Sequence, residues 1–265
     1  MNKGTGLFKK AISSVYGSAS YGWKSLLYVD GTLRNDWSST LPEDNNSFLY
    51  PSVTSSLILS ELPGIKDQRW LSFAKARLGW AQVGNDTDPY QLYKVYDAMN
   101  SIDGKTAYGL PSKLNNKELK PEITSSWEAG LQLQLFNNLI GVDFTYYNNN
   151  SKNQIISLPT SDGFGYSSQL INAGKINNKG IELTLTANPI RQKNWDWTII
   201  GNFSKNKNKI VKLSDDVNTL ELSGTLVSLV AKEGEGYGQI MGSDFVYTSD
   251  GQKVVDKDGV YMYTN

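Results

Sequence analysis

The chain has 265 residues, with 26 Lys and Arg, 26 Asp and Glu, no His and a formal net charge of zero. A chain without excess positive charge offers no basic field to a nucleic-acid backbone, so nucleic-acid binding is not expected. The absence of Cys and His excludes disulfides, Ser-His-Asp triads, thiolate nucleophiles and imidazole-ligated metals. Most familiar enzyme chemistries are thereby excluded, and we expect neither catalysis nor a cofactor.

No apolar stretch has the length of a membrane-spanning helix, about 18 or more consecutive residues. The best apolar runs, such as residues 25–29, have the length of a strand. Residues 1–6 lack the apolar segment and the cleavage site of a secretory signal peptide. We therefore expect no export signal in the printed chain.

Alternating segments separated by turns rich in Asn, Asp, Gly and Ser predict an all-β chain from residue 13 onward. One or two further strands are expected between Gly224 and Tyr263, where Asp250-Gly251 and Asp258-Gly259 are hairpin-type turn pairs. No segment shows the 3.6-residue period of a helix. The eight principal strands are predicted over residues 13–22, 26–36, 49–59, 71–83, 123–135, 139–151, 173–187 and 195–207.

The alternation is clearest in residues 127–135, where Trp127, Leu131 and Leu133 lie on one face and Glu128 and Gln132 on the other. Residues 140–146, 181–187 and 195–203 repeat this pattern, and no charge falls on the apolar face of these four strands. A soluble antiparallel sheet alternates in the same way, so alternation alone does not identify a membrane protein.

Strand and loop lengths favour a transmembrane barrel. Soluble strands average about five or six residues, whereas a tilted strand needs about 9 to 11 to cross a bilayer. Short connections at Lys24, at Asn137-Asn138 and in residues 188–194 are expected to alternate with long ones in 84–122, 152–172 and 211–225. Such asymmetry is typical of outer-membrane barrels, although the similar connections 37–48 and 60–70 depart from it.

The tryptophans add a third indication, because an indole ring sits well at the boundary between lipid and water. Two aromatic girdles are predicted, with corner positions in a soluble core as the alternative. All seven Trp are expected near strand ends, with Trp23, Trp70, Trp195 and Trp197 at the short-turn end and Trp37, Trp80 and Trp127 at the long-loop end.

Several segments occur in a familiar order. Residues 17–36 form a hairpin-like segment, 49–53 read Leu-Tyr-Pro-Ser-Val, and 74–85 end in Val-Gly-Asn. Residues 119–130 contain Leu-Lys-Pro-Glu and Trp-Glu-Ala-Gly, and segments 143–147 and 172–182 follow. Together these segments, within residues 13–210, resemble the barrel of the SusC/RagA-type TonB-linked (TonB-dependent) outer-membrane transporters.

This resemblance implies an antiparallel transmembrane β-barrel in the cell outer membrane, in contact with outer-membrane lipid. The family has a barrel of about 22 strands with a plug domain, whereas residues 1–265 are expected to form a partial barrel of about 8–10 strands without a plug. The implied function is uptake of an oligosaccharide or peptide. The implied partners are a SusD-like surface lipoprotein and TonB, which acts through the absent plug.

Two other functions remain open from the residues alone. One is a secreted soluble β-sandwich that binds glycans, and the other is a small passive outer-membrane pore. Asn85-Asp86-Thr87-Asp88 and Asp256-Lys257-Asp258-Gly259 contain parts of a calcium loop without its full ligand pattern, so turns are expected there and no metal. The candidate substrate-binding residues are aromatic residues of the long loops, Tyr90, Tyr93, Tyr96, Tyr108, Phe164 and Tyr166.

Overall fold

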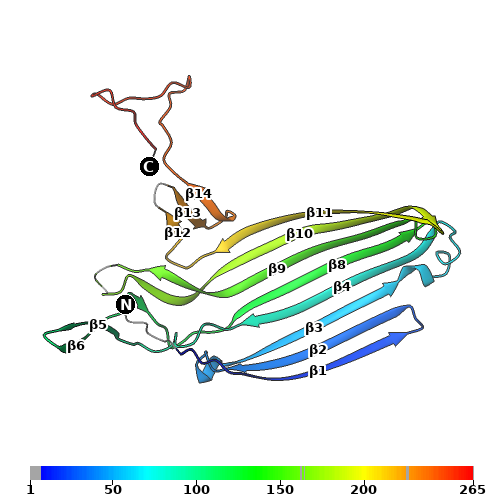
Figure 1. The fold of residues 1–265 in the computed structure, drawn as a ribbon, viewed down its shortest axis with the longest axis horizontal. Coiled ribbons are helices and arrows are strands. Elements are labelled where there is room, and N and C mark those ends of the chain that lie inside the picture. Colours follow the sequence, from blue (N-terminus) through cyan, green and yellow to red (C-terminus); the bar gives the residue numbers. More distant parts are fainter. Residues whose placement is uncertain (1–6, 162, 164, 225–226, 265) are drawn as a thin grey trace. The chain divides into compact units, whose positions relative to one another are not determined.

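The structure is a computed structural model that describes residues 7–161, 163, 165–224 and 227–264. The chain divides into two compact units, Met1–Lys207 and Asn208–Asn265. The first unit is built around one large antiparallel sheet (Figure 1), as the sequence predicts. In spatial order its strands are β1 (Ile12–Trp23), β2 (Leu27–Ser38), β3 (Ser47–Ile58), β4 (Leu71–Asn85), β8 (Glu122–Leu135), β9 (Ile140–Pro159), β10 (Ser168–Gln192) and β11 (Trp195–Lys212).

The strands are joined by tight turns at one end of the sheet. Lys24 and Ser25 have positive φ angles of 50° and 53°, and Phe136, Asn137 and Asn138 have angles of 52°, 55° and 63°. Backbone hydrogen bonds close both turns, from Leu26 N to Trp23 O and from Leu139 N to Phe136 O. The predicted short connections at Lys24 and Asn137-Asn138 are therefore confirmed.

At the other end the strands extend further than predicted. β9 continues to Pro159 and β10 begins at Ser168, which leaves residues 160–167 as the connection in place of the predicted 152–172. At the tight-turn end β10 continues to Gln192, so only residues 193–194 separate it from β11. The added residues begin inside the polar run 148–154, which does not alternate because neither of its faces meets an apolar medium.

The register places the apolar positions of neighbouring strands on one face. Leu131 pairs with Ala76 of β4 and with Phe144 of β9, and Phe144 pairs with Leu183 of β10. The intervening residues, such as Gln132, project from the opposite face because successive side chains of a strand alternate. We call the two sides the apolar face and the polar face.

The apolar face is not covered by a second layer among the described residues. Leu78 is 62 % exposed, Val53 50 % and Leu185 47 %. A soluble sandwich would bury these side chains against a second sheet, whereas a barrel wall presents them to lipid. The single layer therefore fits the barrel interpretation.

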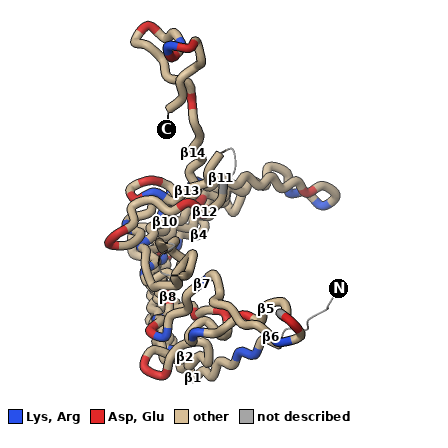
Figure 2. Tube along the Cα trace, turned by 90° about the vertical axis from the view of Figure 1, so that its left-hand side faces the viewer, with Lys and Arg blue, Asp and Glu red and all other residues tan. Residues whose placement is uncertain are grey.

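Curvature of the sheet is visible when it is viewed along its strands (Figure 2). Glycines show the packing on its two sides. A Cβ at Gly130, on the polar face, would collide with the side chain of Arg77, whereas the glycines of the apolar face have open space around them. These are Gly17, Gly31 and Gly201. Side chains converge on a concave surface and diverge on a convex one, so the polar face is the inner side of the curved wall.

Six of the seven tryptophans lie on the apolar face, by the parity of their strands. Two of them correct the sequence prediction, because Trp80 and Trp127 lie within β4 and β8 and not at the strand ends. They pair in register, with ring centroids 6.1 Å apart. Beyond this pair the same face carries Gln82 on β4 and Ser125 on β8, so the continuous run of apolar side chains ends at the tryptophans, with Ile123 as a separate apolar residue near the start of β8.

Smaller elements lie in the connections. β5 (Asp97–Ile102) and β6 (Lys105–Gly109) form a separate hairpin in the loop between β4 and β8, and β7 (Lys113–Leu114) pairs in parallel with β10. The sequence pattern did not predict these strands. Two 3₁₀ turns, η1 (Glu43–Asn45) and η2 (Leu59–Glu61), occur before and after β3. Among the described residues, no helix has the length and hydropathy to cross a membrane.

The second unit contains a three-stranded sheet of β12 (Thr219–Gly224), β13 (Ser228–Lys232) and β14 (Tyr237–Met241). Only β13 and β14 fall in the segment where strands were expected. After β14, isolated bridges join Phe245 to Tyr263 and Val255 to Tyr261. Gly251 and Gly259 have φ angles of 84° and 81° in the connecting turns, so the predicted turn pairs are confirmed.

A charge placed on the apolar face tests which solvent it meets. Leu131 lies midway between Trp127 and Leu135 on β8, at the centre of the band. In the protein that carries this sequence, reconstituted in lipid vesicles, we expect Leu131→Lys to lower the free energy of unfolding by about 2–4 kcal/mol. The neighbouring polar-face variant Gln132→Lys is the control and should change it by less than about 1 kcal/mol. Equal losses would contradict the face assignment.

Candidate functional site

Polar side chains of the inner face form the first candidate surface. Glu128 and Gln132 lie on this face, as the sequence predicts. Strand register and side-chain hydrogen bonds place six further residues there: Lys75, Arg77, Asp143, Glu182, Asp196 and Asn202. In a barrel this surface would line the lumen.

Arg77 organises the centre of the inner face. Its guanidinium group binds Asp143 through two hydrogen bonds, at 2.5 Å from Nη2 and 3.3 Å from Nη1, and Nη2 also donates to Thr145 Oγ1 at 2.8 Å. The side chain crosses β8 above Gly130, where it occupies the space that any Cβ would need. The forked arrangement fixes the position of both charges, since bidentate pairs constrain geometry as well as distance.

Beside this ion pair lies a polar hollow of about 400 Å³. Tyr147 donates a hydrogen bond to Asn206 Oδ1 at 3.2 Å, and its ring covers Gly180. Among the described residues, Asn149 Oδ1 is buried without a hydrogen-bond partner. An unsatisfied buried oxygen favours a donor from outside the described chain. The hollow is lined by Glu128, Thr145, Tyr147, Asn149, Asn178, Glu182 and Asn206.

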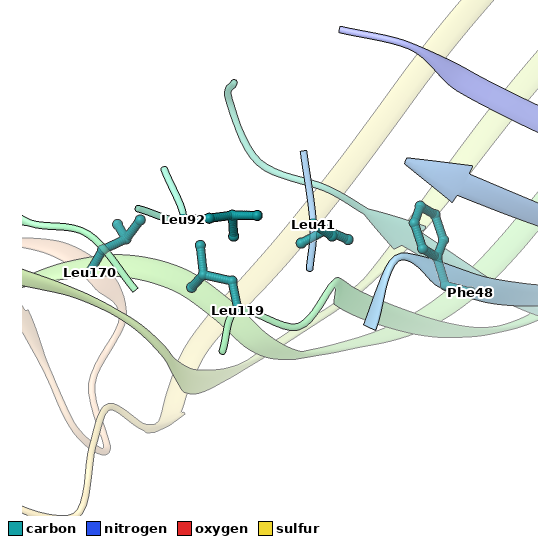
Figure 3. Close-up of a cluster of buried hydrophobic side chains, with 5 residues drawn as sticks. All are labelled: Leu41, Phe48, Leu92, Leu119 and Leu170. Carbon is teal, nitrogen blue, oxygen red and sulfur yellow. The ribbon is translucent and has the colours of Figure 1, made fainter. Parts of the chain in front are cut away.

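The outer loops have a core of their own at the long-loop end of the sheet. Three of its members come from loops and two from the ends of β3 and β10 that reach this region, with Tyr50 and Ile155 packed against them. Leu119 is fully buried although it lies outside any strand. The loops are therefore packed together and do not extend separately into solvent. Figure 3 shows the buried cluster Leu41, Phe48, Leu92, Leu119 and Leu170.

A buried carboxylate ties three parts of this end together. Asp86 follows β4, and its side chain is only 5 % exposed. It forms an ion pair with Lys10, which precedes β1, and accepts hydrogen bonds from Ser38 and from Thr40 Oγ1, the latter at 3.1 Å. Burial opposes the charged form, but these donors outweigh it and hold the pKa of Asp86 below its ordinary value. The Asn85-Asp86-Thr87-Asp88 segment thus acts as a structural junction.

Asn172 provides a second junction between loops. Its side chain accepts a hydrogen bond from Lys120 N and donates one to Lys120 O, both at 2.7 Å, and it also donates to Asn153 O at 3.0 Å. One amide side chain thereby pairs with the backbone as a strand would. The segment before β8 is fixed against β9 and β10 in this way.

The candidate tyrosines occupy exposed positions on anchored backbone. Asn115 Nδ2 donates to the carbonyl oxygens of Tyr90 and Tyr93, at 3.0 and 2.9 Å. The side chains of Tyr93, Tyr96 and Tyr108 are 72 %, 70 % and 67 % exposed, and Tyr108 projects from β6 opposite Ala98. None of these three tyrosines belongs to the buried cluster of this end or packs against it as Tyr50 does.

The remaining candidates differ from these. Tyr90 is 56 % exposed, has a φ angle of 66° and contacts the segment before β1 through Phe8 and Lys9 N. Tyr166 is partly buried, and its carbonyl accepts a hydrogen bond from Thr160 Oγ1. Phe164 lies outside the described residues. The structure brings Tyr90 and Tyr93 together and places Tyr96 and Tyr108 on the hairpin of β5 and β6 and its approach.

The packing of Arg77 over Gly130 leads to a stability prediction. In Gly130→Ala the new methyl group would collide with Arg77 and displace it from Asp143, and such overpacking costs about 1–3 kcal/mol. We expect this loss in the denaturant-induced unfolding of the vesicle-reconstituted protein. Gly201→Ala, where the new methyl has open space, is the matched control and should be nearly neutral. An unchanged free energy of unfolding in Gly130→Ala would show that Arg77 does not depend on the space above Gly130.

The Asp86 junction predicts a pH dependence. Because the pKa of Asp86 is lower in the folded protein than in the unfolded chain, the carboxylate stabilises the fold fully above about pH 4. This stabilisation is lost as the pH falls through the folded-state pKa. Asp86→Asn should lower the thermal midpoint of the outer-loop end at pH 7, by an amount equivalent to about 1–3 kcal/mol. The difference between wild type and variant should shrink below about pH 4. A difference that persists unchanged in acid would show that the charge contributes nothing.

The chain matches the family described as "TonB dependent receptor-like, beta-barrel" over residues 5–258. It is 28 % identical to TonB-dependent receptor P39 of Formosa agariphila over 99 % of this chain and 25 % of that protein. It is also 28 % identical to TonB-dependent receptor SusC of Bacteroides thetaiotaomicron, over 95 % and 26 %. The chain thus spans about a quarter of the length of these relatives.

Solved structures share the fold. A structure of the RagAB peptide importer in a "closed-closed" state matches with a TM-score of 0.80 and 24 % identity, over 96 % of this chain and 29 % of that one. Its "open-open" state matches with a TM-score of 0.77 and 23 % identity, over 97 % and 28 %. The relatives are named as receptors or transporters and not as enzymes. The chain belongs to the TonB-dependent receptor-like β-barrel family, which confirms its resemblance to the SusC/RagA type.

Proposed function

We propose that this chain is part of the barrel wall of an outer-membrane, TonB-dependent transporter that takes up an oligosaccharide or a peptide. The observation that carries the proposal is the division of one sheet into two faces. The apolar face, bordered by Trp80 and Trp127, suits lipid, and the polar face, with the Arg77–Asp143 pair, suits a lumen.

Strand edges support a larger barrel. β1 and β11 are the outer strands of the described sheet, so each has one side without a neighbour in this sheet. Unpaired backbone groups in hydrocarbon cost several kcal/mol each. Additional strands must therefore lie beside β1 and β11 in the membrane. A small passive pore closed by β1 and β11 alone is disfavoured, because these two strands are not paired.

The outer-loop end is the proposed place of substrate capture. Tyr93, Tyr96 and Tyr108 expose aromatic rings on backbone that Asn115 and the β5–β6 pairing hold in place. Rings on a fixed backbone lose little entropy on binding and can stack on a sugar or pack against a peptide. Tyr90, Phe164 and Tyr166 remain candidates of the same site.

The partners are proposed from the SusC/RagA type. A SusD-like surface lipoprotein would meet the outer-loop end, where the loop core gives it a firm surface. TonB would deliver energy through a plug domain in the lumen, and the described residues contain no such domain. The polar hollow beside Tyr147 is suited to hydrogen-bond a lumenal segment or a substrate.

Substitution of the exposed tyrosines tests the capture site. In cells that express the complete transporter, we expect Tyr93→Ala, Tyr96→Ala and Tyr108→Ala together to reduce uptake of labelled oligosaccharide or peptide at least about tenfold, because each stacked ring is worth about 0.5–1.5 kcal/mol. The triple Tyr→Phe variant keeps the rings and should retain most uptake. Surface labelling would confirm equal amounts in the outer membrane. Unchanged uptake in the alanine variant would exclude these rings from the site.

A further inference from the structure

The apolar face carries lysines where its apolar band ends. Trp127, Asn148 and Lys179 form one register row across β8, β9 and β10. On the tight-turn side of this row, the same face carries Tyr146 and Ile181. Lys179 is thus the first charged side chain beyond the band on β10, and it is exposed.

β11 continues this pattern. Thr184 donates to Asn202 Oδ1 at 2.9 Å and Thr198 to Asn188 Oδ1 at 2.8 Å, so the even-numbered residues of β11 lie on the polar face. Lys205 and Lys207 are odd-numbered and project from the apolar face, beyond Phe203. Both lysines lie toward the long-loop end of β11, as Lys179 does on β10, and both are exposed.

Charge is sorted by face in this region. In the described part of β8 to β11, the acidic residues lie on the polar face, as Glu128 and Glu182 do. The apolar face carries none of them beyond the row of Trp127. Lys179, Lys205 and Lys207 form no ion pair there. Lysines without a protein counter-charge can bind an external anion.

Two asparagine side chains lie on the same face as these lysines. Asn177 Nδ2 donates to Asn148 Oδ1 at 2.6 Å and to Asn150 Oδ1 at 3.0 Å. Both oxygens are therefore satisfied, and the side-chain nitrogens of Asn148 and Asn150 donate to no partner among the described residues. Two amide groups are left as donors beside the lysines, and an anion with several oxygens would use both.

We propose that this outer-wall basic patch, made of Lys179, Lys205, Lys207, Asn148 and Asn150, binds the phosphate-bearing headgroup of an anionic lipid in the outer leaflet. The inference rests on the proposed outer-membrane location. Lys179 and Lys205 lie two residues beyond the band and Lys207 four, or about 5 and 10 Å along the membrane normal for tilted strands. The headgroup layer begins at that height and is about 5–8 Å thick.

Lipid, and not a soluble anion, is the expected occupant because the patch continues the lipid-facing wall. A lipid whose acyl chains lie against Ile181 and Phe203 carries its headgroup at the level of the lysines. Lysine side chains can also bend toward the headgroups along their apolar stems. Three lysines in a loop would have no lipid-facing wall beside them to hold the acyl chains of a bound lipid.

Lipid binding to the purified complete protein tests this proposal. The probes are diphosphoryl lipid A, phosphatidylcholine and inorganic phosphate, each titrated into the detergent-solubilised protein and followed by native mass spectrometry and by the thermal midpoint. We expect lipid A to bind and raise the midpoint, more weakly at high salt. Phosphatidylcholine and inorganic phosphate should not produce this stabilisation.

The triple variant Lys179→Gln, Lys205→Gln and Lys207→Gln should bind lipid A about a hundredfold more weakly, from a contribution near fivefold per lysine. The triple Lys→Arg variant should keep binding. Lys94→Gln, Lys105→Gln and Lys117→Gln remove the same charge from the outer loops and should leave binding unchanged. Far-ultraviolet circular dichroism of each variant separates lost binding from lost folding.

Several results would overturn the proposal. They are undiminished lipid A binding by the Gln variant, an equal loss in the loop control, or equal stabilisation by inorganic phosphate. If the Gln variant fails to fold, the salt dependence and the phosphate comparison on wild type decide. The measurement uses no transport, so lipid binding without uptake would overturn the proposed function alone, and uptake without lipid binding would overturn this inference alone.

Discussion

Backbone hydrogen bonding in a medium without water is the constraint on which this structure depends. A strand in hydrocarbon must satisfy its amide and carbonyl groups with neighbouring strands, since lipid offers no partner. The sheet from β1 to β11 satisfies this requirement for every inner strand. Its apolar side chains then need no second protein layer, and the wall remains stable at a thickness of one sheet. Everything else follows from which way each side chain points.

The alternation of the strands lets the two faces be specified independently. On the inner face, Gly130 and Gly180 make room for Arg77 and Tyr147, so a crowded concave surface holds large polar side chains without strain. On the outer face, glycines such as Gly201 face open space. The same residue type thus has opposite structural roles on the two sides. Whether a substitution is tolerated therefore depends on which face of the sheet its position in the strand points to.

The sequence predicted the wall well because the wall obeys a period of two. Trp127 to Leu135 and Ile181 to Ala187 needed no tertiary information, since the medium imposes the pattern. Beyond the band both faces meet polar surroundings, the period disappears, and the continuations of β9 and β10 were therefore missed. Trp80 and Trp127 were placed at strand ends because the sequence shows where the band ends, whereas the strands continue past that point.

The loop end was less predictable for a different physical reason. Its core brings single leucines of separate loops, such as Leu92 and Leu119, against residues at the ends of β3 and β10, and no local pattern marks residues that meet only after folding. The Asn85–Asp88 segment has the composition of a turn, and the sequence does not show the junction because the partners of Asp86, Lys10 and Ser38, are distant along the chain. The prediction that the tyrosines bind substrate rests on their chemistry and their loop position alone. Their role depends on what they contact outside this chain, and sequence periodicity carries no record of that.

The two ends of the wall also differ in what fixes them. At the tight-turn end, residues such as Lys24 and Asn137 accept positive φ angles so that successive strands stay in register. At the loop end, side chains perform this task, because Asn172 pairs with the backbone of Lys120 and Asp86 joins three segments. Backbone turns fix the connection but leave little surface. Side-chain junctions let long loops expose rings such as those of Tyr93 and Tyr108 while the strands below keep their register, so the loop end can vary in surface chemistry without a change in the wall.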